Sequence, residues 1–356
     1  MFYLKDIQLK NFRCYSDYNV SFDKSINIIV GNNAIGKTSL LESVCFLGLC
    51  KSFKTNFDGD MIKNGENYFY IKGTLENDDK EFKIVAALTE KGKSINVNDN
   101  IYKKISDYYG FLNIVCFSPS DLSVVKGEPK GKRQFLDTNI GQIDHAYLKD
   151  VINYKKVLKE RNELLKNFNK FNKLMDLLKV YNLELIKIGK DIIRRRKKFL
   201  NDIEPYINKK IKDISKSEEI KVIYKPNVDN SEFEKELFGA TNRDIALKTT
   251  TVGPHRDDII FNLDGVDAGI YGSQGQQRTI ALAIKLGLAD YLKEKGYNLI
   301  ILLDDVFGEL DYNRQAELLN VVNGDTQVLI TTTAIDNVNK DIIKESNIIN
   351  LGEKVI

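Results

Sequence analysis

A glycine-rich loop near the N-terminus is the strongest chemical signal in the chain. Residues 31–38 read GNNAIGKT, which matches G-x-x-x-x-G-K-[ST], between the apolar run Ile26–Val30 and a helix-like run from Ser39. In this context backbone N–H groups wrap phosphates, the lysine reaches the β/γ oxygens and the threonine binds Mg²⁺. The alternative is an ordinary strand-to-helix turn. We expect ATP and Mg²⁺ to bind at Gly31, Asn32, Asn33, Ala34, Ile35, Gly36, Lys37, Thr38 and Ser39.

A second signal is the apolar run Leu299–Leu303, which ends in two carboxylates, Asp304 and Asp305. A phosphate loop needs an acid to hold its metal ion, and successive side chains at a strand end point to opposite sides. We expect Asp304 to bind Mg²⁺ together with Thr38, and Asp305 to polarise the attacking water. These two carboxylates and Lys37 would form the catalytic set. The alternative is a strand that ends in a solvated Asp-Asp turn.

A third signal is GSQGQQR at 272–278, which runs into a helix-like segment. Ser273 is a good N-cap, and Gly275 lets a ligand approach the backbone, so this is a second anion-binding helix start that also includes Gln276. One ATP does not need two such helix starts from one subunit. We therefore expect Ser273, Gly275 and Gln276 to meet an ATP held by another copy of the chain, although many helices begin with Ser and Gly.

The elements that must position these residues follow from hydrophobic periodicity. Apolar residues at 3/4 spacing predict two long helices, over 147–168 and 174–203, folded as a hairpin, with Pro205 ending or kinking the second. Other helices are expected at 276–293 and 313–320. Strands are expected at 2–9, 18–22, 26–30, within 68–97, and at 112–117, 258–263, 299–303 and 327–331. These patterns predict a mixed α/β protein with an inserted helical segment.

The charge of the chain is unevenly distributed. The formal net charge is +3, but residues 151–216 carry 15 Lys and 4 Arg against 8 acidic residues, a local balance of +11. Such a segment can neutralise DNA phosphates without reading bases, although most Lys-rich helices are simply solvated. The candidate DNA-binding residues are Lys155, Lys156, Lys159, Arg161, Arg194, Arg195, Arg196, Lys197 and Lys198.

Composition excludes several classes of protein. The chain has 356 residues, which is enough for two domains. Its residues are 42% hydrophobic, and this composition excludes a collagen-like or a disordered protein. Four Cys and two His do not make a zinc site, and the Cys are expected as free thiols in a reducing compartment. The charged N-terminus lacks the apolar block of a signal peptide, and no run is long enough for a membrane helix. We expect a cytoplasmic protein without membrane contact.

The order of the motifs, followed by Glu309-Leu310-Asp311, resembles the ABC-type ATPase heads of the SMC family. The segments LKNFRCY at 9, FSPSDLSVVKGEPKGKRQFLD at 117, YKKVLKERNELLK at 154, GPHRDD at 253, GSQGQQRTIALA at 272 and LLDDVFGELD at 302 resemble the RecF family, over nearly the whole chain. Departures from that family are Ser120 where an acid is usual, Lys54 where Arg is usual, and Thr331-Thr332-Thr333 where many ABC ATPases have a His.

The resemblance implies an α/β fold: an ABC-type ATPase head, with an antiparallel β subdomain, formed by 1–127 and 236–356, and a basic helical lobe formed by 128–235. It implies a DNA-binding protein of recombinational repair and replication. This protein would bind single-stranded, double-stranded and gapped DNA, dimerise on ATP, work with RecO and RecR to load RecA, and affect the SOS response. Arg13 is a weaker candidate for phosphate contact.

The resemblance also implies slow, DNA-stimulated hydrolysis, because Asp305 stands where many ABC ATPases have the longer Glu. The alternatives are an SMC-like DNA clamp of another chromosome process, in which ATP binding could be vestigial, and a P-loop enzyme such as a nucleotide kinase. A kinase would need a second substrate pocket and no Ser-Gln-Gly-Gln motif.

Overall fold

The hydrophobic runs of the sequence become two sheets and a set of long helices in the computed structural model, which describes residues 2–78, 80–167, 174–215, 219–306, 315 and 326–352. The chain forms two units, each of which is made of separate segments. The first comprises Met1–Asp121, Tyr206–Ser217 and Ala281–Ile356, and the second comprises Leu122–Pro205 and Glu218–Ile280. The predicted Glu309-Leu310-Asp311 segment, and the helix at 313–320 apart from residue 315, lie outside the described residues.

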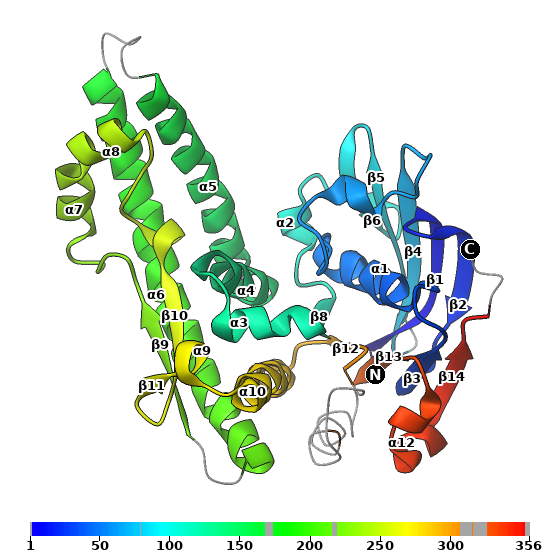
Figure 1. Ribbon diagram of the computed structural model, residues 1–356. Helices are drawn as coiled ribbons and strands as arrows, with labels where there is room; N and C mark the ends of the chain where they lie inside the picture. The colour runs from blue at the N-terminus through cyan, green and yellow to red at the C-terminus, as the bar shows by residue number, and fades with distance from the viewer. Residues whose placement is uncertain are drawn as a thin grey trace. The chain divides into compact units, whose positions relative to one another are not determined.

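The first unit contains a parallel sheet in the order β14-β3-β13-β12-β8 (Figure 1). Its central strands are buried on both faces, which explains their continuous apolar runs. The predicted strand at 26–30 is confirmed without change, and those at 299–303 and 327–331 are each one residue longer. The bounds are β3 Ile26–Val30, β8 Asn113–Phe117, β12 Leu299–Asp304, β13 Gln327–Thr332 and β14 Ser346–Asn350.

An antiparallel sheet in the order β2-β1-β4-β5-β6-β7 completes the β structure of this unit among the described residues. In β1 the buried positions alternate, but the alternation shifts between Leu4 and Ile7, where the pairing with β4 contains a bulge between Leu4 and Asp6. The bounds are β1 Phe2–Phe12, β2 Tyr15–Ser21, β4 Phe69–Asn77, β5 Lys80–Thr89, β6 Gly92–Val97 and β7 Asn100–Ile101.

Helix α1 (Lys37–Leu49) packs against strands of both sheets. It is apolar around most of its circumference, and nearly all of its residues are buried, as expected for a helix between two layers. The first unit also contains the short elements η1 Asp58–Met61, α2 Ile105–Tyr108, η2 Pro119–Asp121, η6 Ile335–Asn337 and α12 Lys340–Lys344.

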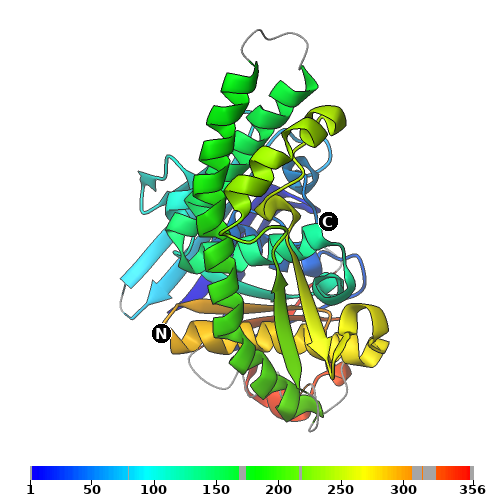
Figure 2. The ribbon, with the colours of Figure 1, turned by 90° about the vertical axis from the view of Figure 1, so that its left-hand side faces the viewer.

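The second unit is built around a hairpin of α5 (His145–Lys166) and α6 (Leu174–Ser215), which confirms the predicted helix pair. Near the turn, Leu164, Leu165, Leu174 and Leu178 form a buried cluster. Helix α6 does not end at Pro205: it continues to Ser215, and Figure 2 shows it as one uninterrupted helix. Its last residues, from Tyr206, belong to the first unit.

The rest of the second unit contains a small sheet in the order β11-β10-β9 and several shorter helices. This unit therefore holds more than residues 128–235, because the strands and helices of 236–280 group with the hairpin. The bounds are α3 Leu122–Lys126, α4 Pro129–Ile143, β9 Ile220–Lys225, α7 Phe233–Gly239, α8 Thr241–Leu247, η4 Pro254–Arg256, β10 Asp258–Leu263, β11 Val266–Asp267 and α9 Ala268–Tyr271.

Helix α10 (Gln274–Glu294) starts in the second unit and ends in the first, and it confirms the helix predicted at 276–293. The predicted fold class, an α/β protein with an antiparallel β subdomain and a helical lobe, agrees with the structure. No helix among the described residues is long and apolar enough to cross a membrane.

Candidate functional site

The glycine-rich loop connects β3 to α1 at the carboxyl end of the parallel sheet. Gly36 has φ +110°, and a Cβ there would lie 2.7 Å from the Tyr15 hydroxyl and 2.9 Å from Cys14 Sγ, so only glycine fits. The Tyr15 hydroxyl donates to the Gly36 carbonyl at 3.0 Å. Asn32, Asn33 and Ala34 are exposed, whereas Ile35 is buried. The β1–β2 turn therefore packs against the end of the loop and fixes its path.

Lys37 folds back over this loop. Its Nζ donates to the carbonyls of Gly31 at 2.7 Å and Asn32 at 2.9 Å. Burial lowers the pKa of Lys37, and the negative charges of Asp305 and Asp304 oppose that shift. The ammonium group therefore lies inside the loop, within electrostatic reach of both predicted catalytic carboxylates.

The predicted metal ligands are in contact with each other. Thr38 Oγ1, in the first turn of α1, donates to Asp304 Oδ1 at 2.8 Å. Hydroxyl and carboxylate oxygens are the hard donors that Mg²⁺ prefers, together with waters and phosphate oxygens, so the pair fits this ion. Thr38 and Asp304 would hold it, and Mg²⁺ bound there would neutralise charge on the β- and γ-phosphates.

Asp304 and Asp305 have different surroundings, as expected for neighbours at a strand end. Asp304 is buried, and burial raises the pKa of its carboxyl, while hydrogen bonds from Thr38 and Thr331 and the charge of Lys54 lower it. Asp305 is exposed and has φ +52°. The structure thus brings Lys37, Thr38, Asp304 and Asp305 to one end of the sheet, where one carboxylate is buried and the other is exposed.

Arg13 is engaged by the protein itself. Its Nε and Nη2 donate to the two carboxylate oxygens of Glu42 at 2.7 and 2.5 Å, and its Nη1 donates to the Asp60 carbonyl. Glu42, which is fully buried in α1, also accepts a hydrogen bond from Ser52 Oγ. Ser52 Oγ in turn accepts from the backbone N–H of Lys54. Arg13 therefore links the β1–β2 turn to α1 and to the segment that follows it, and its phosphate contact stays a prediction.

Glu42 and Ser52 were missed by the sequence reasoning. Glu42 did leave a signal, because it is the one carboxylate in an otherwise apolar helical run, SLLESVCFLGL. A charge at such a position is expected to be buried with a partner. The partner itself, Arg13, comes from a different part of the chain.

The predicted signature residues form a helix start in the second unit. Ser273 Oγ accepts from the Gln276 N–H at 3.2 Å, and Gln276 Oε1 accepts from the Ser273 N–H at 2.9 Å, which is a capping box. Ser273 and Gly275 are exposed. A Cβ at Gly275 would meet only the Ser273 hydroxyl, at 3.9 Å, so packing within the chain does not require glycine there.

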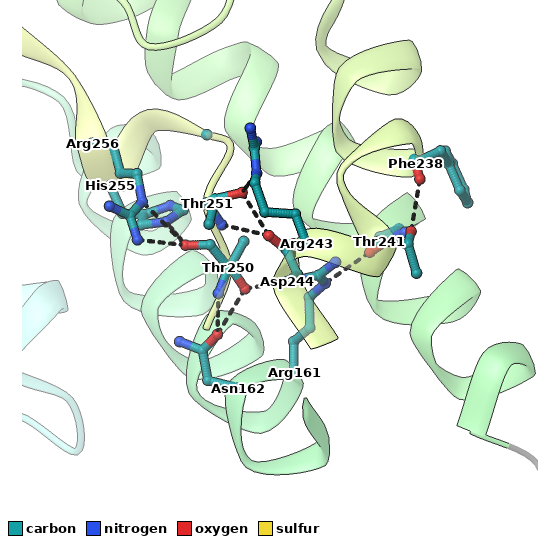
Figure 3. A network of polar contacts seen from close by, with 12 residues as sticks. Arg161, Asn162, Phe238, Thr241, Arg243, Asp244, Thr250, Thr251, His255 and Arg256 are labelled. Carbon is teal, nitrogen blue, oxygen red and sulfur yellow. Dashed lines mark hydrogen bonds and ion pairs between the residues drawn. The ribbon is translucent and has the colours of Figure 1, made fainter. Parts of the chain in front are cut away.

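The structure contradicts the predicted DNA-binding role of two residues, Arg161 and Arg196. Arg161 is completely buried, and its Nη1 pairs with Asp244 at 2.8 Å and donates to Thr250 (Figure 3). Its Nε donates to Asn182. This network joins α5 to α6, to α8 and to the segment before β10. The Arg161 side chain is therefore internal and cannot reach a DNA backbone.

Arg196 is the second correction. It is 4% exposed and pairs with Asp257 and Asp137, both at 2.9 Å, and it donates to the Tyr147 hydroxyl and the Pro254 carbonyl. Arg195 is partly buried and pairs with Asp150 at 2.9 Å. The other candidates are exposed on α5 and α6: Lys155, Lys156, Lys159, Arg194, Lys197 and Lys198. These six residues are the basic face of the hairpin.

A family model and individual relatives both match nearly the whole of this chain. The family model described as "RecF/RecN/SMC N terminal domain" matches residues 3–349. The DNA replication and repair protein RecF of Agathobacter rectalis is 43% identical over 336 residues, which cover 94% of this chain and 92% of that protein. RecF of Bacillus cytotoxicus is 39% identical over 362 residues, which cover 98% and 96%.

Solved structures also match nearly the whole of this chain. The structure of the recombination mediator protein RecF-ATP in the RecFOR pathway matches with a TM-score of 0.89 and 34% identity, over 95% of this chain and 94% of that chain. The Smc head domain of Pyrococcus furiosus matches with a TM-score of 0.54 and 16% identity, over 95% and 92%, which shows a shared fold.

Proposed function

Because this chain belongs to the RecF family of DNA replication and repair proteins, we propose that it is an ATP-operated switch that binds DNA during recombinational repair. The observation that carries the proposal is the contact between Thr38 and Asp304, at 2.8 Å, beside Lys37 and the exposed Asp305. This is the set of groups that binding a nucleoside triphosphate with Mg²⁺ and activating a water require.

The nucleotide end of the switch follows from the chemistry of these residues. Backbone N–H groups of the loop and Lys37 would bind the phosphates, and Asp305 would orient the attacking water. An Asp carboxylate reaches roughly 1–1.5 Å less far than a Glu carboxylate, and a misplacement of that size can cost about 100-fold in rate. We therefore expect weak ATPase activity, which suits a switch that stays closed better than it suits a motor.

Dimerisation would complete the site. The exposed helix start at Ser273, with a glycine that packing does not require, supports a role for Ser273, Gly275 and Gln276 in binding the γ-phosphate held by another copy of the chain. ATP would then close two heads on each other, and hydrolysis would release them. DNA would raise turnover because it promotes the dimer.

DNA binding is assigned to the basic face of the hairpin, whose six cations are exposed, three of them in ion pairs with carboxylates of the chain. Exposed cations can neutralise DNA phosphates. We expect single-stranded, double-stranded and gapped DNA as ligands, RecR and RecO as partners, and an indirect effect on RecA loading and the SOS response, in the cytoplasm. The solved relative named above belongs to the RecFOR pathway, which supports these partners.

A mixing experiment tests the dimeric site. Ser273→Arg would place a bulky cation at the helix start, so the variant should bind ATP but hydrolyse none. Lys37→Ala should also be inactive alone. When the two proteins are mixed, one composite site combines both defects and the other combines two intact halves, so partial ATP hydrolysis should return. Loss of ATP binding by Ser273→Arg alone would place the motif in the same subunit's site and contradict the proposal.

A further inference from the structure

Thr331 lies on β13, the strand next to the one that ends in the two predicted catalytic carboxylates. Strand β13 runs parallel to β12, and Thr331 is the register partner of Asp304. The Thr331 side chain is completely buried. Its Oγ1 lies 3.0 Å from Asp304 Oδ1, 3.4 Å from the Leu303 carbonyl and 2.9 Å from the backbone nitrogen of Asp305. One hydroxyl therefore touches both of the residues that are expected to act on ATP.

The hydrogen atoms of this group can be assigned. A hydroxyl has one hydrogen to donate and two lone pairs to accept with. Asp304 Oδ1 is closer than the Leu303 carbonyl, and a bond to a carboxylate is the stronger of the two, so the Thr331 hydroxyl donates to Asp304. The Asp305 N–H donates to the same oxygen. The hydroxyl is thus a link from the Asp304 carboxylate to the Asp305 backbone.

The link also bears on the Asp305 backbone. Its φ of +52° lies in the left-handed region, which is uncommon for non-glycine residues although Asp enters it more readily than most, and the hydrogen bond to Thr331 helps to hold it there. If the N–H lost its acceptor, the peptide could relax and turn the Asp305 side chain away. Asp304 Oδ1 is held from two sides, by Thr38 in the first turn of α1 and by Thr331 on β13. Thr331 would therefore still hold it if the Thr38 hydroxyl bound Mg²⁺ instead.

We propose that Thr331 is a positioning residue for ATP hydrolysis, which sets the metal-binding carboxylate and the water-orienting residue through a single hydroxyl. This inference rests on the proposed function. A threonine suits the task because its branched side chain has few rotamers in a central strand, so the hydroxyl keeps one direction. Valine at this position would have the same shape without the hydroxyl, and serine would keep the hydroxyl.

The test compares Thr331→Val with Thr331→Ser. Thr74→Val is the matched control, because Thr74 is a buried strand residue of the antiparallel sheet whose hydroxyl donates to Asp6 at 3.0 Å. ATP turnover, the KM for ATP and hydrogen–deuterium exchange of residues 299–306 without nucleotide are measured for each protein. We expect Thr331→Val to lower kcat by about 10–100-fold with KM nearly unchanged, since a shift of roughly 1 Å has effects of that size.

The exchange of the Asp305 amide should be faster in Thr331→Val than in the parent. Thr331→Ser should restore both turnover and protection, and Thr74→Val should match the parent in both. Parent-like turnover or exchange in Thr331→Val, or equal losses in the Val and Ser variants, would overturn the inference alone. A parent protein that hydrolyses no ATP even with DNA would overturn the proposed function, and this inference with it.

Discussion

The nucleotide site was predicted from motifs and the basic hairpin from a count of charges. The structure agrees more closely with the first prediction than with the second. At the predicted nucleotide site, the spacing of the loop motif places Lys37 over the loop, and Thr38 contacts Asp304 from the separate strand end. In the hairpin, some of the positively charged side chains lie on the surface and others lie in the interior. Arg161 and Arg196 are buried in ion pairs, while Lys156 and Lys159 are exposed.

The difference has a geometrical cause. A loop motif is a continuous stretch of backbone, so sequence spacing fixes its shape. On a helix, successive residues are turned by about 100°, so five consecutive cations at 194–198 cover the whole circumference and cannot all face solvent. Arg196 lies at helical spacing from Ile192 and Phe199, which are buried, and so it shares their side. A composition count of charge therefore overestimates the DNA-binding surface.

The largest effect is expected at the nucleotide site. Lys37→Ala should abolish ATP binding, because the charge of the β- and γ-phosphates would be left uncompensated. The free energy of unfolding should change by no more than about 1 kcal/mol, since the two hydrogen bonds of Nζ seen in the described residues go to carbonyls of the surface loop. Titration with a fluorescent ATP analogue and chemical denaturation measure the two quantities. ATP binding at parental affinity would contradict the assignment of the loop.

Arg161 should matter for stability and not for DNA. Arg161→Met leaves Asp244 as a buried charge without its partner, which should lower the free energy of unfolding by about 3–5 kcal/mol. Lys159→Met, on the exposed side of the same helix, is the control and should change it by about 0.5 kcal/mol or less. Urea denaturation measures both. Equal, small effects would show that the buried network is dispensable.

If the basic face of the hairpin binds DNA, changing it should alter the salt dependence of the DNA affinity. Replacement of Lys156, Lys159 and Lys197 by Ala should weaken DNA binding. It should also make the plot of log affinity against log salt shallower by about 0.9 for each DNA phosphate that the variant no longer neutralises. Replacement of Lys91, Lys103 and Lys104, which are exposed on the first unit, is the matched control. An unchanged slope in the hairpin variant, or the same change in both, would remove the hairpin as the DNA surface.

A smaller, pH-dependent effect is expected at His255, in the same polar network as Arg161 (Figure 3). Burial lowers the pKa of His255 to about 4. Its Nε2–H donates to the Thr250 carbonyl, and its Nδ1 accepts from the Tyr154 hydroxyl. The unfolded chain therefore takes up the proton first. The free energy of unfolding should fall by about 2–3 kcal/mol as pH drops from about 6.5 to 4.

His255→Gln isolates this contribution. The variant should be less stable than the parent at pH 7, but its stability should depend less on pH between 6.5 and 4. Denaturation midpoints measured across that range give the difference between the two proteins. Parallel pH profiles would show that His255 takes up its proton equally in the folded and unfolded chains.

The parts of the molecule whose structure is set by residues close together in the sequence could be predicted from the sequence. The strands at 26–30 and 299–303, the N-cap at Ser273 and the helix pair were all predicted from local patterns. Thr331 was noted only as a departure from a family pattern, because its role depends on the register between β12 and β13. The pairing of Arg13 with Glu42 likewise joins two separate segments, and no local pattern predicts it.

The proposed switch depends above all on one property, namely that ATP controls the association of two copies of this chain. Sedimentation velocity with ATP, with ADP, and with ATP plus gapped duplex DNA measures that property. We expect a monomer with ADP, a dimer with ATP that DNA strengthens, and a persistent dimer for Asp305→Asn with ATP. A parent protein that sediments identically with ATP and ADP, or a Lys37→Ala variant that dimerises with ATP as the parent does, would contradict the switch.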